Sequence, residues 1–145
     1  MTKARIYLCL SLVWMAIIFA FSNQAYSGRI TETYLGAANV PVRKLGHVTE
    51  FAILALLYLK TLSSYLGGKL AQNKPFRGQI ILHALALALA VAYAALDEWH
   101  QAFVPGRSSS FSDVLVDTTG MVIALGLSLF LTFRRRKKGP SVQSP

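Results

Sequence analysis

Four long apolar stretches constrain the fold of this 145-residue chain more than any other feature of its sequence. They cover residues 6–21, 45–66, 80–96 and 114–133. A helix needs roughly 17–25 residues to cross a bilayer, and these runs are rich in Leu and Ala without the strict alternation of strands. Because backbone groups in lipid must be hydrogen-bonded within the chain, the sequence predicts an all-α, polytopic membrane protein folded as a four-transmembrane-helix bundle.

We expect a single membrane domain over residues 1–145, with a basic tail at its C-terminal end. The predicted helices lie near 6–22, 45–66, 80–101 and 113–133, and the tail covers 134–145. A short helix around residues 30–38 is expected to rest on the membrane surface, because Ile30, Tyr34 and Ala38 recur at helical spacing. The alternative for residues 1–22 is a cleaved signal peptide, but no small-x-small cleavage site follows the apolar run.

The composition excludes two other classes of protein. Hydrophobic residues make up 54% of the chain and charged residues only 14%, whereas a soluble domain carries about 25% charge. A chain this apolar is also not disordered. The single cysteine, Cys9, excludes an intrachain disulfide and a cysteine-based zinc site.

The basic residues punctuate the apolar runs, which is typical of membrane proteins and argues against a nucleic-acid partner. Of the 15 Lys and Arg residues, 11 flank the runs on the side of the two termini and 4 lie on the opposite side. The positive-inside rule therefore predicts that both termini are cytoplasmic. All six acidic residues fall on the opposite, outer half.

Three polar clusters interrupt the apolar pattern at the predicted outer ends of the helices. Arg43, His47 and Glu50 share one helical face, as do Asp97 and Gln101, and as do Asp113 and Asp117. On the third helix we expect Glu98 and Trp99 to point away from the face that carries Asp97. Arg107 lies in a Pro–Gly turn before the fourth helix, from which we expect its planar fork to fold back over the carboxylates and hold one of them in a bidentate pair.

Charged groups on a membrane helix usually face the bundle interior, because exposure to acyl chains is costly. Two interpretations remain open: an ion-pair lattice that closes the bundle, and a water-filled polar pocket that opens to the outer leaflet. The variety of polar residue types favours the pocket. We expect it to be lined by Arg43, Lys44, His47, Glu50, Asp97, Glu98, Gln101, Arg107, Asp113 and Asp117.

These residues and their neighbours resemble the VanZ-like family. The resemblance covers roughly residues 6–130, and it implies a small, multi-pass protein of the bacterial inner membrane. The namesake of the family confers low-level resistance to the antibiotic teicoplanin. The matching motifs are Arg43-Lys44 with His47 and Glu50-Phe51, Asp97-Glu98 with Gln101, Phe103 and Pro105-Gly106-Arg107, Asp113-Val114 with Asp117 and Gly120, and Ser22-Asn23-Gln24.

Three functions are compatible with this pattern. The first is a protein that binds or modifies an amphiphile of the cell envelope, either a lipid-linked precursor or a lipoglycopeptide antibiotic, with Arg43, Lys44 and Arg107 holding a phosphate or carboxylate. The second is a membrane hydrolase or transferase in which Glu50, His47 and Asp97 are the general acid–base candidates. The third is a structural membrane partner; a transporter is disfavoured because no inverted repeat is visible. No cofactor is predicted, and no metal either, since a ligand spacing such as His-Glu-x-x-His does not occur.

Overall fold

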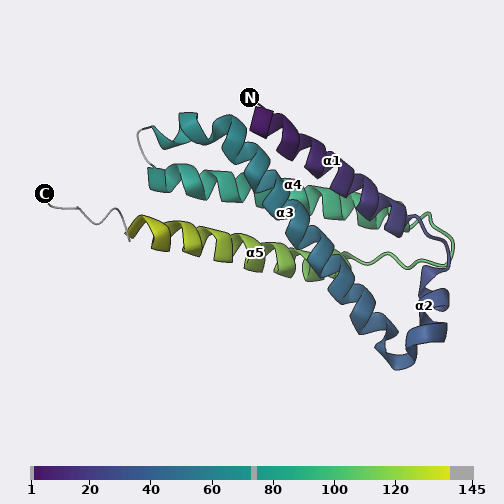
Figure 1. Cartoon of the computed structure of the whole chain (residues 1–145). Coiled ribbons are helices and arrows are strands. Elements are labelled where there is room, and N and C mark those ends of the chain that lie inside the picture. Colours follow the sequence, from purple (N-terminus) through teal and green to yellow (C-terminus); the bar gives the residue numbers. More distant parts are fainter. Residues whose placement is uncertain (1, 73–74, 138–145) are drawn as a thin grey trace, which may run out of the picture.

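The computed structural model describes residues 2–72 and 75–137 and is built from helices (Figure 1). Four of them are long: α1 (Thr2–Ser22), α3 (Asn39–Ala71), α4 (Pro75–Gln101) and α5 (Phe111–Lys137). A short helix, α2 (Ser27–Leu35), and a 3-10 turn, η1 (Gly36–Ala38), join α1 to α3. The four long helices have the length and apolar composition of membrane spans, which confirms the predicted all-α membrane fold.

The long helices extend beyond the predicted apolar runs at both ends of each run. Helix α3 begins at Asn39 rather than near residue 45, so Arg43 and Lys44 lie on its first turns. Pro41 does not interrupt it, because a helix tolerates proline in its first turn, where the amide has no intrahelical acceptor. The short helix expected around residues 30–38 is present as α2 and η1.

Helix α3 is the centre of the bundle and packs against α1, α4 and α5 (Figure 1). The buried core along it includes Phe51, Leu54 and Ala55. On α4 the core residues Ala86, Ala90 and Ala94 recur every fourth position, which forms a stripe of small side chains. Small residues allow membrane helices to approach closely and gain van der Waals contact.

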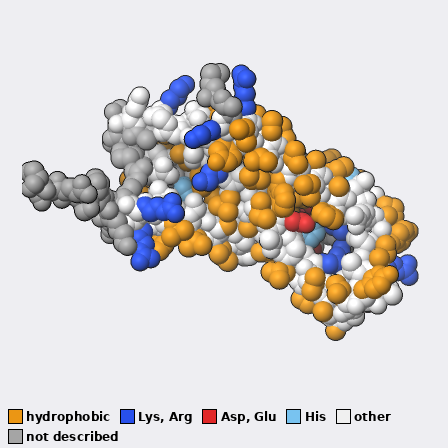
Figure 2. All heavy atoms as spheres, in the orientation of Figure 1, with side chains coloured by type: hydrophobic (Ala, Val, Ile, Leu, Met, Phe, Trp, Pro, Cys, Tyr) orange, Lys and Arg blue, Asp and Glu red, His pale blue; other side chains and the backbone are white. Residues whose placement is uncertain are grey.

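The two ends of the bundle differ in their chemistry. We call the end that contains the N-terminus of α1 and the α3–α4 connection the basic end, since Lys and Arg side chains gather there, on the left in Figure 2. We call the other end the polar end. It is formed by the C-termini of α1 and α4, the N-termini of α3 and α5, and α2 (Figure 1).

Candidate functional site

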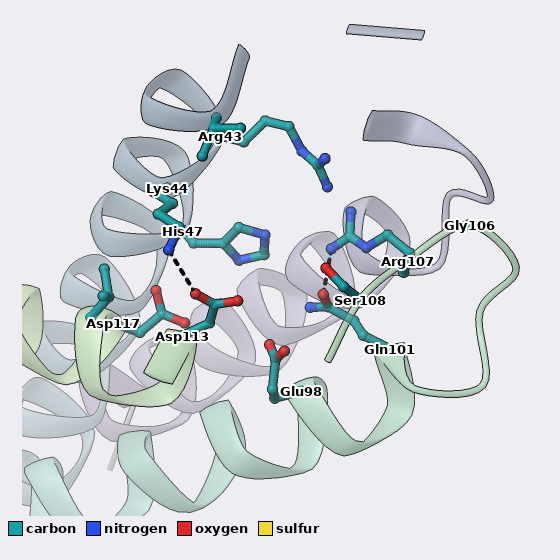
Figure 3. A pocket seen from close by; sticks show the side chains of 12 residues that line it. Arg43, Lys44, His47, Glu98, Gln101, Gly106, Arg107, Ser108, Asp113 and Asp117 are labelled. Atoms are coloured by element: carbon teal, nitrogen blue, oxygen red, sulfur yellow. Dashed lines mark hydrogen bonds and ion pairs between the residues drawn. The ribbon is translucent and has the colours of Figure 1, made fainter. Parts of the chain in front are cut away.

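Two cavities open side by side at the polar end. The main cavity has a volume of about 180 Å³ and is lined by residues of α3, α4, α5 and the α4–α5 connection (Figure 3). Its lining consists of Val40, Arg43, Lys44, His47, Glu98, Gln101, Gly106, Arg107, Ser108, Asp113, Val116 and Asp117. The side cavity, also about 180 Å³, shares Arg43, His47 and Arg107 with it. The two cavities are therefore adjacent compartments of one site.

Two guanidinium groups extend into the main cavity, one from α3 and one from the α4–α5 connection (Figure 3). Arg107 donates hydrogen bonds to Gln101 Oε1 at 2.7 Å and to Ser27 Oγ at 2.9 Å. Arg43 lies against α2, where a β-carbon on Gly28 would come within 2.6 Å of Arg43 Nη1. Within residues 2–72 and 75–137, neither arginine has a carboxylate at ion-pair distance.

The charge of Arg43 affects the pKa of its neighbour Arg107. The pKa of the Arg107 guanidinium is lowered, first because the side chain is partly buried and second because Arg43 is close. An arginine remains charged under these conditions. The site thus holds two like charges, neither of them paired with a carboxylate within residues 2–72 and 75–137, and this arrangement favours an anionic ligand.

Three carboxylates form the opposite side of the main cavity (Figure 3). Asp113 is paired with Lys44 at 3.0 Å, and both side chains are partly exposed. Glu98 is buried and accepts the backbone N–H of Ser110 at 2.7 Å. Asp117 is only 5% exposed, and among the described residues it has no hydrogen-bond or ion-pair partner.

A close approach of α5 to α3 positions Asp117. Gly120, one helical turn after Asp117, lies against α3, where a β-carbon would meet the backbone oxygen of Val48 at 2.6 Å. A larger residue would push the helices apart. The glycine therefore allows Asp117 to reach the cavity beside His47, which comes from the facing turn of α3.

Asp97 lies behind the lining of the cavity rather than in it. Its Oδ2 accepts hydrogen bonds from Ser22 Oγ at 2.7 Å and from Gln101 Nε2 at 2.8 Å. The other oxygen, Oδ1, is buried and has no partner among the described residues. Since Gln101 also accepts from Arg107, a continuous hydrogen-bond network leads from Asp97 to the arginine.

Glu50 lines the side cavity and not the main one. Its Oε2 lies 3.9 Å from Nδ1 of His47, which borders both cavities. Phe21 and Thr31 contribute to the opposite wall of the side cavity. The His47–Glu50 pair therefore stands at the boundary between the two compartments.

One sequence-based expectation about this site is wrong. Arg107 does not hold a carboxylate in a bidentate pair, because its fork is occupied by Gln101 and Ser27. Glu98 lines the main cavity, as expected, and it points away from the face that carries Asp97. Helix α4 has neighbours on several sides, so Asp97 can face α1 while Glu98, one residue further, faces α5. Trp99, at 65% exposure, does point outward.

Three residues that support the site were not among the predicted site residues. Ser22 binds Asp97, Ser27 binds Arg107, and Asn39 donates to the Gly28 carbonyl at 2.9 Å and so ties the start of α3 to α2. Only Ser22 had a sequence signal, through its place in the Ser22-Asn23-Gln24 motif. A serine in a connecting segment has no periodicity that would mark it.

The two connections at the polar end are joined to each other. The backbone N–H of Tyr26 donates to the Pro105 carbonyl at 3.0 Å. Gly106 has φ 75°, and a β-carbon there would collide with the Tyr26 ring. A positive φ and a contact this close both require glycine. The Pro–Gly turn therefore fixes Arg107 relative to α2.

The chemistry available here is that of a polar site with both signs of charge. Within the described part of the chain, no three His, Cys, Asp or Glu side chains come together in a way that would hold a metal ion. The arginines offer donors for a phosphate or carboxylate, and the carboxylates offer acceptors for a cation. His47 and Glu50 border the cavities, where a side chain of either type could exchange a proton with a bound group.

One of the comparisons with known proteins identifies a family. No curated protein and no solved structure matched the chain. The model of the VanZ/LLP1 family matches residues 7–133, which include most of each of the four long helices and both connections of the polar end. This chain is a multi-pass membrane protein that belongs to the VanZ/LLP1 family.

Proposed function

We propose that the protein binds the anionic headgroup of an amphiphilic cell-envelope molecule at its polar end. Arg43 and Arg107 would take the phosphate or carboxylate of a lipid-linked precursor or of a lipoglycopeptide antibiotic, while the apolar part stays in the membrane. One observation carries this proposal: two guanidinium groups face a cavity, and neither has a carboxylate partner in the described part of the chain.

The size of the main cavity supports binding of a headgroup rather than of a whole lipid. A volume of about 180 Å³ corresponds to roughly six water molecules at about 30 Å³ each. This is room for a small polar group. An acyl chain would have to lie outside, along the apolar surface of the bundle shown in Figure 2.

We place the polar end at the outer leaflet of the bacterial inner membrane, with both termini in the cytoplasm. The support is the distribution of Lys and Arg, which favours the basic end as the cytoplasmic one. A cavity at headgroup depth in the outer leaflet would be accessible both to envelope precursors and to antibiotics that arrive from outside.

A purely structural ion-pair lattice is the weaker alternative. Of the charged and histidine side chains at the polar end, only Lys44–Asp113 and His47–Glu50 lie within ion-pair distance in residues 2–72 and 75–137. A lattice would pair the remaining charges with one another. Arg43, Arg107, Glu98 and Asp117 instead line a cavity.

One observation favours a catalytic variant of this function. His47 lies 3.9 Å from Glu50 and borders both cavities, so it could move a proton to or from a bound headgroup. Lipid mass spectrometry of cells with and without the gene tests this variant. An envelope lipid that changes chemically only when the gene is present supports a hydrolase or transferase; an unchanged lipid profile contradicts it.

Binding itself is tested by native mass spectrometry of the purified full-length protein. We expect phosphate- or carboxylate-bearing amphiphiles to co-purify with the wild type and to be lost from Arg107→Gln. The matched control is Arg29→Gln, which removes the same charge from the exposed face of α2. Equal retention of these amphiphiles by both variants would contradict the proposal.

A further inference from the structure

We infer that the preferred headgroup is zwitterionic, with a phosphate on the arginine side of the main cavity and a primary ammonium on the carboxylate side. This inference rests on the proposed function and specifies its ligand. It follows from how the charges of the cavity are paired, from one buried carboxylate without a partner, and from the types of residue in the lining.

The main cavity is lined by equal numbers of basic and acidic side chains, and the charges of opposite sign lie on different sides of it. Lys44 and Asp113 satisfy each other at 3.0 Å. Arg43 and Arg107 remain on one side, and Glu98 and Asp117 on the other (Figure 3). A purely anionic group bound by the arginines would lie opposite two carboxylates, whereas a zwitterion complements both sides at once.

Asp117 identifies where the cation would bind. Its side chain is 5% exposed, faces the cavity and has no donor among the described residues. Its carboxylate oxygens are open to the cavity and not sealed in the core, so a ligand in the cavity can reach them. Glu98 differs, because it already accepts a hydrogen bond from the Ser110 amide. The ammonium of the ligand would supply the donor that Asp117 lacks.

The lining distinguishes a primary ammonium from a quaternary one. Quaternary ammonium groups are bound by the faces of aromatic rings, and none of the residues that line the main cavity is Phe, Tyr or Trp. A primary ammonium carries three N–H donors, which carboxylate oxygens accept directly. The chemistry therefore points to an ethanolamine phosphate group rather than a choline phosphate group.

The test measures affinity of the full-length protein in detergent by isothermal titration calorimetry. Four probes are compared: short-chain phosphatidylethanolamine, phosphatidylglycerol and phosphatidylcholine, and water-soluble glycerophosphoethanolamine. We expect the wild type to bind phosphatidylethanolamine about tenfold or more tightly than the other two lipids, since each hydrogen bond to a charged group contributes at least this factor.

Asp117→Asn should remove that preference, about tenfold in affinity, and leave binding of phosphatidylglycerol unchanged or stronger. The matched control is Glu32→Gln, the same change of charge on exposed α2, which should keep the preference. A thermal unfolding scan of each variant distinguishes loss of binding from loss of fold. If Asp117→Asn is unfolded, the preference of the wild type among the lipids still decides the inference.

Two results would overturn the inference: equal affinity of the wild type for phosphatidylethanolamine and phosphatidylglycerol, or an equal loss of both in Asp117→Asn. In either case, loss of all lipid binding in Arg107→Gln would still support the proposed function, whereas a wild type that binds no lipid would contradict it. Tighter binding of the lipid than of glycerophosphoethanolamine supports a membrane source for the headgroup. Equal binding of the two supports the same chemistry from a soluble source.

Discussion

At the basic end arginines and lysines stand singly on the surface, whereas at the polar end charges of both signs lie inside the bundle. Arg5, Lys69, Arg77 and Arg134 are exposed, and no ion pair is found for them within the described residues. Glu98 and Asp117 are buried, and Arg107 is held by two hydrogen bonds. Exposed charges at a helix end need no partner, while buried ones need fixed geometry.

This difference separates two uses of charge. At the basic end the number of Lys and Arg residues is what matters, because their excess determines the orientation in which the chain inserts into the membrane. The polar end depends on position, because side chains such as Asp97, Glu98 and Arg107 have defined hydrogen-bond partners. Substitutions should accordingly be tolerated at the basic end and harmful at the polar end, and four measurements examine that contrast.

The largest expected effect is all-or-none and concerns orientation. In a Cys9→Ser background, Ser109→Cys in the α4–α5 connection should react with a membrane-impermeant maleimide in intact cells. Gln72→Cys, at the basic end, should react only after the membrane is permeabilised. The reverse pattern would invert the orientation and place the cavity on the cytoplasmic side.

Removal of a fixed charge at the polar end should weaken headgroup binding. Arg107→Ala is expected to lower affinity about tenfold or more, the contribution of a charged hydrogen bond. Glu50→Gln should lower it less, because Glu50 lines the side cavity and acts through its neighbour His47. His83→Ala and Ser109→Ala lie outside the cavities and should retain affinity. Calorimetric titration with phosphatidylethanolamine measures the affinity of all four variants. If the two variants outside the cavities lose as much affinity as the two variants at the cavities, the contrast between the two regions is contradicted.

Helix spacing at the polar end should be sensitive to a single methyl group. Gly120→Ala introduces a β-carbon 2.6 Å from the Val48 carbonyl oxygen, and such overpacking typically costs about 1–3 kcal/mol. Gly126→Ala, further along α5, has no atom within 4 Å of the new carbon. The free energies of unfolding in detergent should differ by this amount; equal stabilities would show that α3 and α5 adjust to the added methyl group.

The smallest effect is expected for the exposed ion pair. Lys44 and Asp113 are 49% and 33% exposed, and an exposed pair contributes about 0–1 kcal/mol to stability. Lys44→Ala should therefore change the free energy of unfolding by less than about 1 kcal/mol. A larger loss would mean that this pair holds α3 to α5 and that the polar end is a lattice after all.

The sequence predicts the scaffold well because the bilayer restricts the alternatives. An apolar run of this length in lipid must form a helix, so the four spans follow from the length of the runs, and the short helix before α3 follows from its helical spacing. The predicted bounds are too short because polar residues such as Arg43 do not belong to an apolar run, although the helix continues through them.

The contacts within the site are harder to predict than the helices, since they depend on which helices pack on each side of α4. Asp97 and Glu98 are adjacent in sequence, and only the packing of α4 between α1 and α5 assigns one to the hydrogen-bond network and the other to the cavity. The partners of Arg107 are a serine and a glutamine. An argument from charge alone predicts carboxylates as the partners of Arg107, although neutral side chains lie closer to it.

The contact of Tyr26 with Pro105 and Gly106 has a consequence for how such chains can diverge. Surface connections usually accept insertions and deletions independently of one another. Here a residue inserted into either connection would move Tyr26 away from Pro105 and Gly106, and the contact between the two connections would be lost. Among homologues, the lengths of the two connections should therefore change together, and a homologue with one connection altered alone should have lost the glycine at the position of Gly106.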